Sequence, residues 1–89
     1  MKPRITMNLT DSGTYELWMN ESGRDQLVEE LQKLDARNEH FHLDSFEFGV
    51  QLSTKAYRET DNVLSCGKVY FRLDEWDQEY FPHVMLDPE

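Results

Sequence analysis

The sequence has little of what holds the smallest secreted domains together. Its 89 residues contain one cysteine, Cys66, so no disulfide can form within the chain. The first residues alternate between polar and apolar side chains instead of forming a long apolar run. We therefore expect no signal peptide and no membrane span, and a reducing cytoplasm fits both features.

Clustered glycine and positive charge are also scarce. The four glycines stand singly, so no glycine-rich loop can cradle a phosphate. The 18 acidic residues outnumber the 9 basic ones and give a formal net charge of −9. Such a chain repels nucleic acid and anionic membranes and attracts a basic protein, although solubility alone would also account for the charge. We expect a basic protein partner, no nucleic acid and no membrane.

What the chain does contain is enough apolar surface for one core. Hydrophobic residues make up 38% of the chain and aromatic residues 12%, which suits a single domain over residues 1–89. Ile5, Met7 and Leu9 alternate with polar residues, and Tyr15, Leu17 and Met19 resume this pattern after a turn at 11–13. A period of two residues with one buried face predicts a β-hairpin. The same pattern predicts a strand region at 40–43 and 48–52, either one bent strand or two short ones, and a further strand at 68–73.

A helical period replaces this alternation after Asn20. Leu27, Val28, Leu31 and Leu34 fall on one face and predict a helix from about Glu21 to Ala36, with Asn20 and Ser22 as competing caps. Residues 54–62 read as a loop, and a short helical turn is expected from Asp74. The predicted fold class is α+β, a small antiparallel sheet of about four to five strands with one amphipathic helix packed on one face.

Two histidines raise the question of a metal site. His40 and His42 are two residues apart on a predicted strand and therefore point to the same side, where Cys66 or His83 could in principle join them. The spacing matches no standard zinc pattern, and two imidazoles alone bind metal weakly. We predict no metal, no cofactor and no catalytic residue, hence no enzyme. A small metal-binding or enzymatic domain that uses His40 and His42 is the alternative.

Aromatic residues among acids mark candidate partner-binding positions. Such mixtures combine anchoring area with charge that suits a basic partner, although the aromatic rings could instead close the core. Trp18 is a candidate if it is exposed and a core residue if another element covers it. The candidate partner-binding residues are Glu16, Trp18, His40, His42, Asp74, Glu75, Trp76, Asp77, Glu79 and Tyr80.

Three segments together resemble the immunity protein 32 family of bacterial polymorphic toxin systems. They are residues 16–24 (ELWMNESGR), 38–43 (NEHFHL) and 68–76 (KVYFRLDEW), and the resemblance covers roughly residues 17–76 in motif order and spacing. It implies a small non-catalytic protein that binds and blocks a cognate toxin. The charge of −9 fits such a role, because many of these toxins are basic nucleases. An acidic adaptor subunit and a homodimer remain open.

Overall fold

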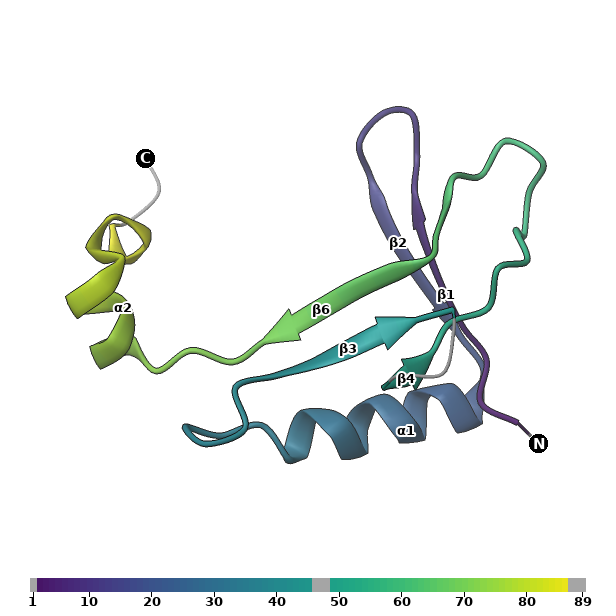
Figure 1. Cartoon of the computed structure of the whole chain (residues 1–89). Helices are drawn as coiled ribbons and strands as arrows, with labels where there is room; N and C mark the ends of the chain where they lie inside the picture. The colour runs from purple at the N-terminus through teal and green to yellow at the C-terminus, as the bar shows by residue number, and fades with distance from the viewer. Residues whose placement is uncertain (1, 46–48, 87–89) are drawn as a thin grey trace.

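The computed structural model describes residues 2–45 and 49–86 of the chain. These residues form six strands, two α-helices and one 3-10 helix (Figure 1). In chain order the elements are β1 (Ile5–Leu9), β2 (Tyr15–Met19), α1 (Glu21–Gln32), β3 (His40–Asp44), β4 (Val50–Gln51), β5 (Val63–Leu64), β6 (Cys66–Tyr70), α2 (Asp74–Tyr80) and η1 (Pro82–Met85). The fold class α+β is confirmed.

The strands form two sheets of three strands each, in the orders β2-β1-β5 and β4-β3-β6, where one antiparallel sheet was predicted. One stretch of chain joins the sheets, because β5 belongs to the first and β6 to the second, with Ser65 between them. The Ser65 carbonyl accepts a hydrogen bond from the Ser45 N–H at 2.8 Å. This segment therefore runs through both sheets, and the Ser53 N–H, which donates to the Ile5 carbonyl at 2.7 Å, links them at a second place.

One strand pair differs from the expected antiparallel pairing. β3 and β4 run parallel, with Leu43 opposite Val50 and Asp44 opposite Gln51. The expectation rested on the rule that parallel strands need a crossover helix. Two residues of a strand rise only about 7 Å, so a contact this brief can form after a short return of the chain. Phe48, predicted to belong to this strand, lies outside the described residues.

Helix α1 begins where predicted and ends four residues early, at Gln32 instead of Ala36. Of the two competing caps, Asn20 is the N-cap, and its side chain accepts a hydrogen bond from the Gly23 N–H at 2.8 Å. The end follows from Asp35, whose carboxylate accepts hydrogen bonds from the N–H groups of Arg37 and Asn38, each at 2.8 Å. Asp35 thus offers the backbone a turn in place of another helical turn.

The core lies between α1 and the two sheets. Its buried members are Ile5, Met7, Leu27, Phe41, Leu43, Val50 and Leu52, with Leu34, Leu64 and Val69 packed against them. Two of the four apolar residues predicted to form the buried face of α1 lie outside this core, because Val28 and Leu31 are 44% and 50% exposed. Helix α1 instead contacts β1 through Gly23, where a Cβ would lie 2.6 Å from the Arg4 carbonyl oxygen.

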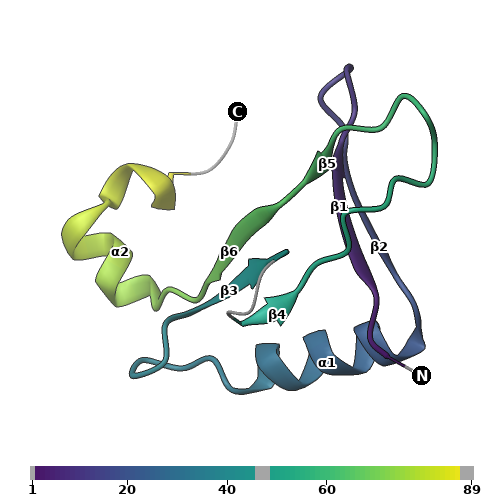
Figure 2. The same ribbon diagram turned by 45° about the vertical axis from the view of Figure 1, so that its right-hand side comes forward.

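The molecule is more extended than a compact domain with the same number of residues. Its radius of gyration is 15.3 Å, with extents of 42 × 31 × 20 Å, whereas a compact domain of this size has about 12 Å. The excess comes from residues 74–86, which we call the arm. Both ribbon views show α2 and η1 standing away from the two sheets and α1, which we call the body (Figures 1 and 2).

Candidate partner-binding surface

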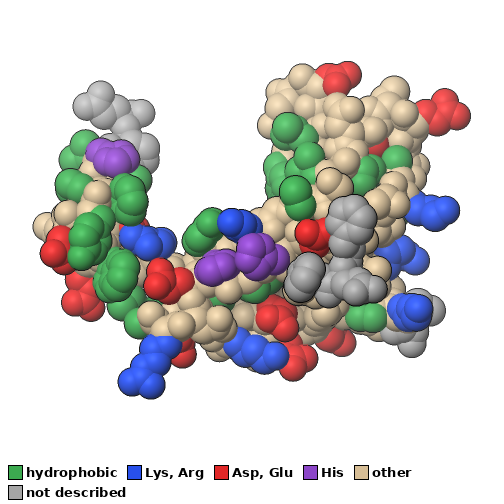
Figure 3. Space-filling model, in the orientation of Figure 1, with side chains coloured by type: hydrophobic (Ala, Val, Ile, Leu, Met, Phe, Trp, Pro, Cys, Tyr) green, Lys and Arg blue, Asp and Glu red, His purple; other side chains and the backbone are tan. Residues whose placement is uncertain are grey.

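One face of the molecule is hollowed between the β1–β2 hairpin and the arm (Figure 3). The outer side of β3 and β6 forms its floor, where His40 lies opposite Tyr70 and His42 opposite Lys68. All four side chains are exposed. The ring of His40 lies 5.1 Å from that of His42 and 5.5 Å from that of Tyr70. The floor therefore carries aromatic and basic groups in an otherwise acidic protein.

The hairpin presents an apolar surface that the sequence assigned to the core. The register places Leu9 opposite Tyr15 and Leu17 opposite Met7, so these side chains share one face of the sheet. Met7 is buried, but Leu9, Tyr15 and Leu17 are 43%, 53% and 41% exposed. Strand β2 is the edge of its sheet and pairs with β1 over its whole length. Hydrophobic side chains are visible on the flank of the hairpin that borders the hollow (Figure 3).

Tyr15 contributes an aromatic ring to this face, and its hydroxyl is partly buried. Burial raises the pKa of the Tyr15 hydroxyl above its ordinary value, because the phenolate is less well solvated there. Met19, the last residue of β2, is 37% exposed on the same face. The face is thus apolar and accessible along the length of β2.

The opposite face of the hairpin is covered by the loop that follows β4. The Tyr57 ring stacks on Trp18 at 4.4 Å, and the Arg58 guanidinium lies 5.7 Å from the Trp18 ring centre. Arg58 also pairs with Asp61 at 2.8 Å and with Glu16. The hydrogen bonds to Asp61 and then Glu16 raise the pKa of Arg58. Glu16 and Trp18 therefore lie on the face of the hairpin that points away from the hollow. The Tyr57 ring partly covers Trp18, which agrees with the alternative that Trp18 is covered by another element.

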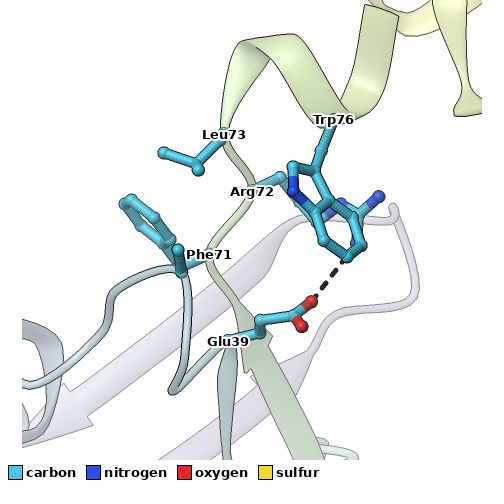
Figure 4. Close-up of a pocket in the computed structure, with 6 residues that line it drawn as sticks. Glu39, Phe71, Arg72, Leu73 and Trp76 are labelled. Atoms are coloured by element: carbon cyan, nitrogen blue, oxygen red, sulfur yellow. Dashed lines mark hydrogen bonds and ion pairs between the residues drawn. The ribbon is translucent and has the colours of Figure 1, made fainter. Parts of the chain in front are cut away.

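Arg72 fixes the root of the arm to the body. Its guanidinium contacts Glu39 at 3.5 Å and Asp77 at 3.0 Å, and its Cζ atom lies 5.4 Å from the Trp76 ring centre and 5.3 Å from that of Phe81. The Phe71 N–H also donates to the Glu39 carbonyl at 2.6 Å. Figure 4 shows the Trp76 ring over the end of the Arg72 side chain and the ion pair between Arg72 and Glu39, in a small pocket at this joint. The contacts of Arg72, rather than a buried apolar core, therefore hold the arm to the body.

Beyond this joint the arm exposes both kinds of side chain that the sequence singled out. The Trp76 and Tyr80 rings lie 5.6 Å apart and are 44% and 58% exposed. Asp74, Glu75 and Glu79 are exposed and make no ion pair within the described part of the chain. Five of the ten predicted binding residues, those from Asp74 to Tyr80 other than Asp77, are therefore accessible together.

Further apolar residues of the arm extend this surface beyond the predicted positions. Phe81, Val84, Met85 and Leu86 are 48%, 56%, 40% and 75% exposed. Phe81 lies against the Arg72 guanidinium and is not a member of the core. Their apolar character was visible in the sequence, but nothing in the pattern showed that α2 and η1 would stand off the body.

The histidines do not acquire further metal ligands. Among the described residues, no group of three His, Cys, Asp or Glu side chains could hold a metal ion. Cys66 is exposed at the far end of β6, opposite Asp44, and His83 lies beside Phe81 in the arm. The geometry thus gives the metal alternative no support, while His40 and His42 remain accessible to a partner.

Comparison of the chain with protein-family models, curated proteins and solved structures found no match. Over the ranges that the structure describes, no helix is both long enough and apolar enough to cross a membrane. The function must therefore be argued from the surface itself.

Proposed function

We propose that this chain is an immunity-type protein that binds a cognate bacterial toxin in the cytoplasm and neutralises it without catalysing a reaction. The observation that carries the proposal is the arm, which holds exposed aromatic rings and exposed acids outside the core. A segment that adds little to the core yet displays large apolar side chains has the character of a binding surface. The motif resemblance to the immunity protein 32 family supports the same reading.

The chemistry of the arm suits a basic partner. Trp76 and Tyr80 offer the large rings that dominate binding energy at protein interfaces. Asp74, Glu75 and Glu79 surround them with negative charge, and the whole chain carries a net charge of −9. This charge would accelerate encounter with a basic toxin and would be screened by salt. Binding of the arm over the toxin's active surface would block it.

Calorimetry with the toxin domain encoded beside this gene tests the proposal. We expect tight binding at low salt that weakens as salt is raised. The charge reversals Glu75→Lys and Glu79→Lys should weaken binding, whereas Glu59→Lys, an equal change on an exposed acid of the loop after β4, should have a much smaller effect. Absence of binding at either salt concentration would refute the proposal.

A further inference from the structure

We propose that, in the absence of another partner, two copies of this chain form a dimer in which the arm of each copy occupies the hollow of the other. The proposal concerns the apolar surfaces on the two sides of the hollow. It stands on their geometry and not on the toxin-binding role.

The first observation is that one chain carries two apolar surfaces that it does not bring together. The arm surface comprises Trp76, Tyr80, Phe81, Val84, Met85 and Leu86, and the hollow surface comprises Leu9, Tyr15, Leu17 and Tyr70. Helix α2 packs mainly against η1 and not against the hairpin. Both ribbon views show the arm and the hairpin apart, at opposite ends of β6 (Figures 1 and 2).

The second observation is the area involved. A large side chain offers roughly 200 Å² when fully exposed, so the exposed fractions correspond to roughly 600 Å² on the arm and roughly 400 Å² in the hollow. Either value reaches the size of the largest apolar patch on a typical monomer. A two-fold dimer would bury each surface twice, for a total of about 2,000 Å², which is the area of a stable interface.

Two copies of a chain with a net charge of −9 repel each other, so the charges at the contact matter. The acids of the arm, such as Glu75 and Glu79, would enter a hollow whose floor carries Lys68, His40 and His42. Lys68 therefore offers the arm an opposite charge, while Asp44, on the same side of β3 as the two histidines, adds one acid at the Cys66 end of the floor. The arm of a second copy would thus cover the apolar side of the hollow and bring its acids close to Lys68.

Two consequences separate this contact from toxin binding. The dimer interface is mainly apolar, so the dimer should persist at high salt, where toxin binding weakens. Both contacts use the arm, so they should exclude each other. A toxin that binds the arm would convert the dimer into complexes with one copy of each protein.

Sedimentation of the full chain measures the dimer directly. We expect a dimer at micromolar concentration. The arm variant Tyr80→Ser/Val84→Ser and the hairpin variant Tyr15→Ser/Leu17→Ser should each raise the dissociation constant about tenfold or more. Leu31→Ser, which changes a side chain 50% exposed on α1, is the matched control and should remain dimeric. Urea unfolding at low concentration verifies that each variant is folded.

Mixing the two variants tests the exchange itself. A dimer of the arm variant with the hairpin variant keeps one intact contact between an arm and a hairpin, whereas each variant alone keeps none. We expect the mixture to form heterodimers at concentrations where each variant alone is monomeric. A monomeric wild-type chain, dimers that survive in both variants, or a mixture that stays monomeric would overturn the proposal. None of these results depends on whether a toxin binds.

Discussion

The body and the arm of this protein use apolar residues in opposite ways. In the body, Ile5 and Val50 are 0% and 1% exposed and pack where two sheets and a helix meet. In the arm, Tyr80 and Val84 are 58% and 56% exposed on a segment that is tied to the body through Arg72. Equal hydrophobicity therefore serves stability in one region and leaves surface for association in the other. Substitutions in the two regions should separate these roles.

The largest effect on stability should come from the centre of the body. Ile5→Ala removes a fully buried side chain from β1 and leaves a cavity between the sheet and α1. We expect the free energy of unfolding to fall by about 3 kcal/mol, measured by urea denaturation. The matched change in the arm, Tyr80→Ala, should lower it by less than about 0.5 kcal/mol. Equal losses at the two positions would remove the distinction between body and arm.

Gly23→Ala tests how closely α1 and β1 are packed. Alanine has the higher helix propensity, so the change would stabilise an isolated helix by about 1 kcal/mol. Here the added Cβ would lie 2.6 Å from the Arg4 carbonyl oxygen and 2.9 Å from Ile5 Cγ1. We expect the clash to outweigh propensity and to lower the free energy of unfolding by about 1–3 kcal/mol. A more stable variant would show that the helix can move away from β1 at little cost.

Asn20→Ala should have a smaller effect at the same end of the body. The Asn20 side chain accepts hydrogen bonds from Gly23 N–H at 2.8 Å and Arg4 N–H at 2.9 Å, and it donates to the Lys2 carbonyl at 2.9 Å. It therefore caps α1 and also ties the helix to the segment before β1. We expect a loss of about 1 kcal/mol in thermal or urea unfolding, with Asn20→Asp retaining the cap to Gly23. A neutral Asn20→Ala change would contradict this role.

Local patterns were sufficient to predict most elements of the body. The alternation of His40 to Leu43 and the start of α1 at Glu21 depend on neighbouring residues, and both are confirmed, with Asn20 as the cap of the two candidates. The early end of α1 depends on how Asp35 bonds the backbone, which competes with helix propensity and is not visible from periodicity. The division into two sheets depends on the long-range pairing of residues 63–70, for which the sequence carries no local signal.

The candidate surface was predictable in composition but not in arrangement. The acids and rings between Asp74 and Tyr80 were visible in the sequence and are accessible in the structure. The alternation in β2 predicts correctly that Tyr15 and Leu17 share a face, but it cannot show that this face stays about half exposed at the edge of the sheet. Trp18 illustrates the same limit, because the ring that covers it, Tyr57, lies in a loop distant in sequence.

The central claim is that the arm serves binding while the body serves stability, and one double variant tests both parts. Trp76→Ala/Tyr80→Ala removes two neighbouring rings of the arm, and its affinity for the adjacently encoded toxin domain and its unfolding by urea would be measured in parallel. We predict that affinity falls about tenfold or more while the free energy of unfolding changes by less than about 1 kcal/mol. Unchanged affinity, or a loss of stability as large as that of Ile5→Ala, would contradict the account.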